Sequence, residues 1–198
     1  GLKLVLKGDA NDYVGKGLSG AILVVKLSDE SNLVSHENTI IGNTVLYGAT
    51  SGKLFVSGQA GERFAVRNSG AIAVIEGCDS NACEYMTGGT IVILGEVGDN
   101  FGAGMTGGMS FVYDPNNQFE KRVNPETIIW QNLETQYWTN YLKDLVEEHF
   151  RETNSNLSKK IIENFDKEIL NFIQVCPKEM LDKLENPIIL NSSVKEVS

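Results

Sequence analysis

The chain has 198 residues, a hydrophobic fraction of 41% and a formal net charge of −9, so it can bury one sizeable core. Acidic residues are spread along the whole sequence, which leaves no basic face for a phosphate backbone and excludes nucleic-acid binding. No apolar run approaches the roughly 18 residues of a membrane span and no secretory leader is visible, so we expect a cytoplasmic protein without membrane contact.

A glycine repeat occupies the first part of the chain. All 20 glycines fall within residues 1–108, and five apolar runs each follow an anchor glycine: Gly20, Gly52, Gly70, Gly89 and Gly108. The last three intervals are 18, 19 and 19 residues, and the first, of 32 residues, accommodates an inserted loop over residues 27–38. One short strand per unit of this length is typical of stacked coils, because no single coil could bury its apolar face alone. The repeat predicts a single-stranded parallel β-helix.

Positions counted from the anchor glycine form columns. We expect two apolar columns to point to one face of the stacked strands: Ile22, Leu54, Ile72, Ile91 and Ser110, and Val24, Val56, Val74, Ile93 and Val112. The eighth position before the glycine is polar and predicts a solvated turn: Asp12, Thr44, Glu62, Asn81 and Asn100. The serines that precede three of the glycines predict side-chain hydrogen bonding along the stack: Ser19, Ser51 and Ser69.

Two stretches of the repeat also match the dinucleotide-binding pattern G-x-G-x-x-G. Residues 15–20 read GKGLSG and residues 102–107 read GAGMTG. A dinucleotide site needs a helix directly after the glycines, because the pyrophosphate binds at the helix N-terminus. Strand-like runs follow here instead. We interpret the anchor glycines as structural corners that need positive φ or close approach between coils, and we expect no cofactor-binding residue.

From about Asp114 the composition changes to Lys, Glu, Asn, Leu and Ile at helical spacing. An amphipathic helix is predicted over residues 135–150, and a second begins at Asn154 or Ser155 and continues through Phe172. Pro177 predicts the start of a third helix that ends near residue 185. We therefore expect a β-helix domain over residues 1–114, and an extended linker with a helical tail, residues 115–198, packed on it.

Several segments resemble, in the same order, the C-terminal glycine-repeat domain of the glutamate synthase large subunit. They are VGKGLSG (14–20), IIGNTVLYGATSG (40–52), GERFAVRNSGA (61–71), ACEYMTGG (82–89) and NFGAGMTGGMSFVYD (100–114), and the similarity continues through residues 147–179. The resemblance implies a right-handed β-helix that holds an amidotransferase region and a synthase region in register. In that family these regions convert glutamine and 2-oxoglutarate into two glutamates.

The resemblance also implies where the chemistry lies. FMN and an iron–sulfur cluster are expected in the rest of the parent enzyme, an oxidoreductase supplied by a small electron-transfer subunit or by ferredoxin. This chain itself is expected to have no catalytic activity and no cofactor. A looser alternative is a free-standing β-helix assembly subunit similar to the C subunit of formylmethanofuran dehydrogenase.

Residues with metal-binding side chains are sparse. Cys78 and Cys83 have the opening spacing of one iron–sulfur pattern, but the following pair is missing and Cys176 lies far away. We interpret all three as free thiols of a protein in a reducing compartment. His36 and His149 lack ligand-type neighbours on a shared face, so no metal site is expected.

The densest charged cluster of the repeat is Glu62, Arg63 and Arg67. One interpretation is that these residues supply a catalytic carboxylate or line a path for ammonia. Catalysis, however, needs a pocket and partner residues that the sequence does not show. We therefore interpret them as domain-docking or turn-capping residues, and we expect no catalytic residue in the chain.

Overall fold

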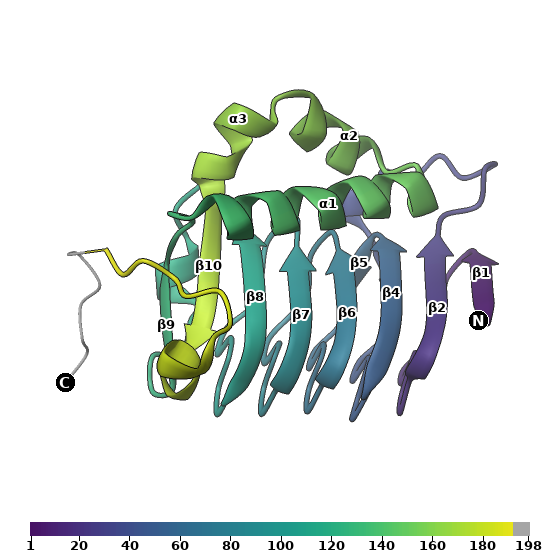
Figure 1. Cartoon of the computed structure of the whole chain (residues 1–198). Helices are drawn as coiled ribbons and strands as arrows, with labels where there is room; N and C mark the ends of the chain where they lie inside the picture. Colours follow the sequence, from purple (N-terminus) through teal and green to yellow (C-terminus); the bar gives the residue numbers. More distant parts are fainter. Residues whose placement is uncertain (192–198) are drawn as a thin grey trace.

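The computed structural model describes residues 1–191. Its main feature is an eight-stranded sheet in the order β1-β2-β4-β6-β7-β8-β10-β9, whose first six strands are parallel (Figure 1). About six coils of roughly 19 residues stack along it. The predicted parallel β-helix is confirmed. The six strands are β1 (Lys3–Lys7), β2 (Ser19–Lys26), β4 (Ser51–Ser57), β6 (Ser69–Ile75), β7 (Thr87–Ile93) and β8 (Gly107–Tyr113).

The second part of the chain forms both helices and strands. Its helices are α1 (Gln136–Thr153), α2 (Asn156–Glu163) and α3 (Phe165–Glu168), with 3-10 turns η2 (Phe119–Lys121), η3 (Ile169–Asn171) and η4 (Lys178–Lys183). Helix α1 lies across the strands and contacts β2, β4 and β6 (Figure 1). Within residues 1–191, no helix is both long and apolar enough to cross a membrane. The inserted loop contains η1 (Ser35–Glu37) and is followed by β3 (Thr39–Ile41), which pairs in parallel with β5 (Gln59–Ala60).

Two predicted helices of the tail are wrong at their ends. The second does not continue through Phe172, because residues Phe172–Pro177 form strand β10. The third begins after Pro177 as predicted, but it is the short 3-10 helix η4, which ends at Lys183. Strand β10 runs antiparallel between β8 and β9 (Ile128–Asn132). The reason is tertiary: the edge of β8 offers unpaired backbone groups, and pairing with it outweighs the local helical pattern.

Each coil turns through three left-handed residues at alternate positions. In one coil these are Arg63, Ala65 and Arg67, with φ of 60°, 58° and 53°. Their amides donate to neighbouring coils: Arg63 N–H to the Ser80 carbonyl at 2.9 Å on one side, and Ala65 N–H to the Val45 carbonyl at 2.9 Å on the other. Inter-coil hydrogen bonds therefore offset the cost of left-handed backbone at residues other than glycine.

The anchor glycines do not occupy equivalent positions in all coils. Strand β2 places Gly20 and Ala21 opposite one residue of β4, because Ser19 pairs with Ser51 while Ile22 pairs with Lys53. Strand β6 has the same bulge against β7. Counting from the glycine therefore shifts these two coils by one residue. For the same reason the predicted polar column matches the first left-handed turn positions in three coils, at Thr44, Asn81 and Asn100. In the two shifted coils these positions are Tyr13 and Arg63 instead of Asp12 and Glu62.

Both predicted apolar columns were consequently wrong, since each mixed the two faces of the sheet. One real column lies on the outer face, under the helices: Val24, Phe55, Val74, Val92 and Phe111. Another points into the solenoid: Val25, Val56, Ile75, Ile93 and Val112. A one-residue slip exchanges the faces because side chains alternate along a strand.

The molecule has two apolar cores, one on each side of the sheet. The interior of the solenoid contains fully buried side chains from the strands and corners, among them Leu54, Phe64, Met86, Ile91 and Phe101. The outer core lies between the sheet and the helices and includes Phe55, Phe111, Trp138, Leu142 and Phe172. Lys53 of β4 also forms an ion pair with Glu148 of α1, with Nζ–Oε1 at 2.7 Å. Burial on both faces fixes the helices to the solenoid.

The three cysteines are free and buried. Burial raises the pKa of the Cys83 and Cys176 thiols to about 12 and that of Cys78 well above its usual value. Because the thiolate is the reactive form, native protein is expected to resist iodoacetamide at neutral pH. All three thiols should react at the rate of free cysteine once urea unfolds the chain. Rapid alkylation of any of them in the native state, seen by mass spectrometry, would contradict the buried placement.

Strand β1 is an exposed edge of the sheet. Leu4, Val5 and Leu6 are 53%, 52% and 42% exposed, although they continue columns that are buried in the following coils. Unpaired strand edges with apolar side chains promote association. We expect the chain by itself to self-associate with increasing concentration, and Leu4→Lys/Leu6→Lys to reduce this association in light scattering. Leu33→Lys, at an exposed loop position, is the control and should change nothing; a strictly monomeric wild-type chain would refute the expectation.

Candidate functional site

The predicted docking residues Glu62, Arg63 and Arg67 lie on one exposed corner of the solenoid. Arg63 Nη2 lies 3.2 Å from Glu84 Oε2, and the Arg67 guanidinium lies 5.9 Å from the centre of the Tyr85 ring. Both arginines therefore contact the next coil while remaining accessible. Their assignment to domain docking stays a prediction.

Polar side chains of the turns connect neighbouring coils. Asn100 Nδ2 donates to Asn81 Oδ1 at 2.8 Å, and Asn124 continues this ladder with the same distance to Asn100. The Ser69 hydroxyl donates to the Ala49 carbonyl of the preceding coil at 3.1 Å, so this serine bonds to backbone rather than to another serine. These contacts account for the polar turns structurally, without a ligand.

A cavity of about 410 Å³ lies where strands β6, β7 and β8 end. Residues of η1, β5, η2 and α2 complete its wall. Its apolar lining consists of Leu94, Val97, Val112, Phe119 and Leu157, together with Pro115. Its charged lining consists of four carboxylates and one guanidinium: Glu37, Glu76, Glu96 and Asp114, and Arg122. An apolar cavity with a few convergent charged groups is the usual form of a small binding site.

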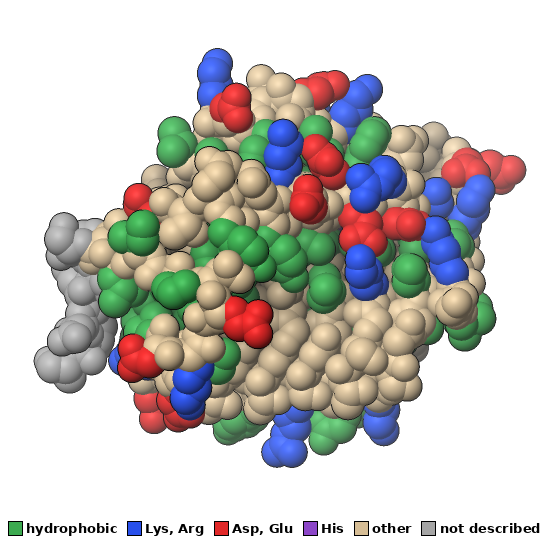
Figure 2. All heavy atoms as spheres, in the orientation of Figure 1, with side chains coloured by type: hydrophobic (Ala, Val, Ile, Leu, Met, Phe, Trp, Pro, Cys, Tyr) green, Lys and Arg blue, Asp and Glu red, His purple; other side chains and the backbone are tan. Residues whose placement is uncertain are grey.

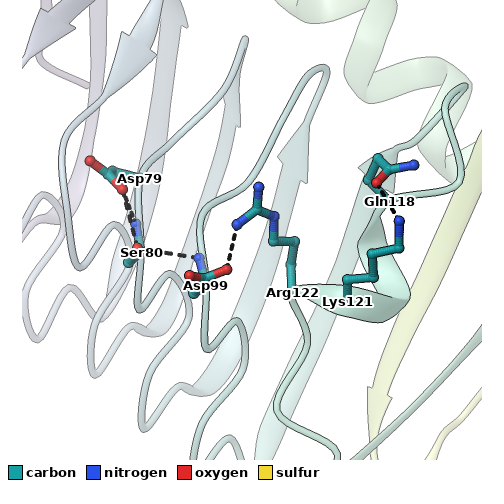
Figure 3. A network of polar contacts seen from close by, with 6 residues as sticks. All are labelled: Asp79, Ser80, Asp99, Gln118, Lys121 and Arg122. Carbon is teal, nitrogen blue, oxygen red and sulfur yellow. Dashed lines mark hydrogen bonds and ion pairs between the residues drawn. The ribbon is translucent and has the colours of Figure 1, made fainter.

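The one guanidinium of the lining is already neutralised. Arg122 forms an ion pair with Asp99, which belongs to a polar network along the turns (Figure 3). The Asp114 carboxylate accepts hydrogen bonds from the amides of Gln118 and Phe119, at 2.9 and 2.8 Å. Glu37 and Glu96 are exposed at the rim, so the cavity carries a net negative charge.

The fourth carboxylate, Glu76, is buried beneath the helices and only 1% exposed. Its Oε1 accepts hydrogen bonds from the hydroxyls of Ser57, at 3.1 Å, and Ser155. His149 Nε2 lies 3.7 Å from the same oxygen, the distance of an ion pair rather than a hydrogen bond. Within residues 1–191, Glu76 Oε2 is buried without a hydrogen-bond partner.

Local structure of the helices brings these groups to Glu76. Asn154 takes a left-handed conformation, with φ of 60°, and ends α1. Ser155 then caps α2, its Oγ accepting the Ser158 amide at 3.1 Å, while the same hydroxyl donates to Glu76. His149 lies one turn earlier on α1, where Thr153 Oγ1 donates to its carbonyl at 2.7 Å. Ser155, the N-cap of α2, thus links the junction of α1 and α2 to Glu76 at the end of β6.

Sequence reasoning missed Glu76 and its contact with His149. The two residues are far apart in the chain and belong to a strand end and a helix, so no local spacing relates them. One signal was present: Glu76 directly follows the apolar run AIAVI, where a charge must find buried partners.

Burial raises the pKa of Glu76, but His149 and the Ser155 hydroxyl outweigh it, with a smaller contribution from Ser35, and the pKa lies below the usual 4.5. A lowered folded pKa stabilises the protein above the unfolded value, and this stabilisation is lost as pH falls through the folded value. We expect Glu76→Gln to reduce the free energy of unfolding at pH 7 by about 1–3 kcal/mol.

Urea denaturation at pH 7 and at acid pH tests this expectation. Wild-type protein should lose more stability on acidification than Glu76→Gln, because the variant has no carboxylate to protonate at this position. Glu120→Gln, which alters an exposed carboxylate, is the matched control and should follow wild type. Parallel pH profiles for wild type and Glu76→Gln would refute the assignment.

Comparison with known proteins places the chain among long relatives. The family model described as "GXGXG motif" matches residues 1–178. The glutamate synthase [NADPH] large chain of Azospirillum brasilense is 58% identical over 194 residues, which are 98% of this chain and 13% of that protein. The corresponding large chain of Bacillus subtilis is 45% identical over 189 residues (93% and 12%), and ferredoxin-dependent glutamate synthase 2 of Synechocystis is 45% identical over 185 residues (93% and 12%). The chain thus spans about an eighth of the length of these relatives.

Proposed function

Because the chain belongs to the GXGXG-motif family and is similar to a segment of glutamate synthase large chains, we propose that it is a non-catalytic structural domain of a glutamate synthase. In this proposal the solenoid holds an amidotransferase region and a flavin-containing synthase region of the same polypeptide at a fixed separation. FMN and the iron–sulfur cluster belong to the remainder of that polypeptide. Electrons come from a small partner subunit or from ferredoxin.

The continuous, doubly packed sheet is the observation that carries the proposal. Six parallel strands in one stack extend over roughly 25–30 Å at the usual strand spacing. Cores on both faces and inter-coil hydrogen bonds at every corner resist bending. A rigid solenoid of this kind can hold two attached regions at a fixed distance and orientation. Charged side chains of both signs are interspersed over the helices (Figure 2), which favours specific contacts over attraction to a uniformly charged partner.

The relatives favour a domain over a free-standing assembly subunit, since each is about eight times as long as this chain. Their names include NADPH- and ferredoxin-dependent enzymes, both of which contain a similar segment. A spacer could have the same role in enzymes with different electron donors, because a spacer need not touch the donor.

Lengthening the solenoid by one coil tests the proposal. Duplicating residues 72–89, which Ile72↔Thr90 pairing defines as one coil, should add a layer without disturbing the others. In a large chain that contains this sequence, we expect glutamine hydrolysis and ammonia-dependent glutamate synthesis to persist, while glutamine-dependent synthesis falls at least ten-fold. An insertion of equal length in the exposed loop over residues 27–38 is the control. Unchanged coupling would reject the spacer role, and loss of a single half-reaction would indicate a catalytic role.

A further inference from the structure

The acidic cavity has the shape and lining of a site for an amphipathic cation. Its volume of about 410 Å³ exceeds that of one side chain and leaves room for the backbone that carries it. Leu94, Val97 and Phe119 provide an apolar wall, against which the methylene stem of a lysine or arginine could pack while its charged end meets carboxylates.

The two rim carboxylates, Glu37 and Glu96, form no ion pair within residues 1–191, whereas Glu76 and Asp114 already accept hydrogen bonds. Arg122 is paired with Asp99 outside the lining, as Figure 3 shows. Glu37 and Glu96 lie at the rim, and on the floor the buried Glu76 has one oxygen, Oε2, without a hydrogen-bond partner within residues 1–191. A cation in the cavity would meet the carboxylates of Glu37 and Glu96, and the negative charge of the buried Glu76 adds to the potential that attracts it.

We propose that this cavity receives a basic side chain, the ammonium of a lysine or the guanidinium of an arginine, from the part of the parent polypeptide outside this chain. The identity of the occupant rests on the proposed function, since the relatives have about seven-eighths of their length outside the matching segment. Binding of an alkyl cation by the cavity rests only on its own lining.

Other occupants fit less well. An anionic ligand would meet four carboxylates and one paired guanidinium. Within residues 1–191, no group of three or more His, Cys, Asp or Glu side chains is arranged to hold a metal ion. The negative charge of the lining therefore favours a cation over an anion, and the separation of its carboxylates favours an organic cation over a metal ion.

The first experiment measures binding of n-butylguanidinium to the 198-residue chain by saturation-transfer NMR, with neutral n-butylurea as the matched probe. We expect a dissociation constant on the order of 1 mM for the cation and at least ten-fold weaker binding of the urea. Glu37→Gln/Glu96→Gln should weaken cation binding at least ten-fold, whereas Glu30→Gln, on the exposed inserted loop, should not. Equal binding of the two probes, or unchanged binding by the double variant, overturns the cavity's assignment as a cation site.

The second experiment identifies the occupant by carboxyl footprinting. Carbodiimide and glycine ethyl ester should modify Glu37 and Glu96 in the isolated chain, and at least ten-fold more slowly in a full large chain that contains this sequence. Equal rates in the two proteins overturn docking of a parent segment, even if the coil insertion still uncouples the enzyme. Protection together with unaffected coupling after coil insertion would reject the spacer role alone. The two proposals thus fail separately.

Discussion

Val74→Asp is expected to lower the free energy of unfolding by at least ~4 kcal/mol, a large part of the about 5–15 kcal/mol of an ordinary domain. Val74 is fully buried in the outer core, where it pairs with Phe55 and Val92 of the neighbouring coils beneath the helices. A carboxylate there would lose its hydration without gaining a partner. Urea denaturation followed by circular dichroism measures the loss.

Two variants separate the buried charge from other effects of this substitution. Val74→Thr keeps the shape and adds only a hydroxyl, so it should cost about 1–3 kcal/mol. Val5→Asp alters a residue of the same column, paired with Val24, but on the exposed strand β1, so it should change stability by less than about 1 kcal/mol. Similar losses for Val74→Asp and Val5→Asp would show that position 74 is not covered by helices.

Gly89→Val is expected to destabilise the protein by about 3–5 kcal/mol, since two separate requirements for glycine coincide at this residue. Its φ is +86°, and an added Cβ would lie 2.2 Å from the Ala71 carbonyl oxygen of the preceding coil. Neither the neighbouring backbone nor the left-handed conformation can adjust without breaking the stack.

Alanine substitutions at three glycines separate the two requirements. Gly48 has φ of +62° and open space around the added Cβ, so Gly48→Ala should cost only about 1 kcal/mol. Gly70 lies outside the left-handed region, but its Cβ would lie 2.1 Å from the Thr50 carbonyl oxygen, so Gly70→Ala reports the steric requirement alone. We expect the order Gly89 > Gly70 > Gly48 in lost unfolding free energy. A loss at Gly48 as large as at Gly89 would contradict this account.

The stacked-coil fold was predictable because its cause is repeated. Five glycines before five apolar runs, at nearly constant spacing, indicate one strand per coil, and the structure has these strands. The register was not predictable. The bulges at Gly20–Ala21 and Gly70–Ala71 each insert one residue, so glycine-based columns exchanged the two faces. Alanine follows the anchor glycine only in these two coils, but an alanine in a strand does not by itself indicate a bulge. Period is a property of the whole repeat, whereas register depends on local hydrogen bonding between particular coils.

Features formed by distant segments were missed for a related reason. Strand β10 exists because the edge of β8 accepts it, and the isolated pattern of residues 165–175 favours a helix. The contact between Glu76 and His149 joins a strand end to a helix, and the cavity beside it is lined by residues from seven elements or their connections. The docking role of Glu62, Arg63 and Arg67 remains a prediction, because it depends on contacts with another domain.

Methyl-labelled NMR of Val and Ile side chains tests the stacked-coil account most directly. The register places Val74 beside Val92 on the outer face and Ile75 beside Ile93 on the inner face, each pair on adjacent coils. We predict strong nuclear Overhauser effects within both pairs, and none between Val56 and Val74, which lie on opposite faces. A strong Val56–Val74 effect, with none between Val74 and Val92, would contradict the stacking described above.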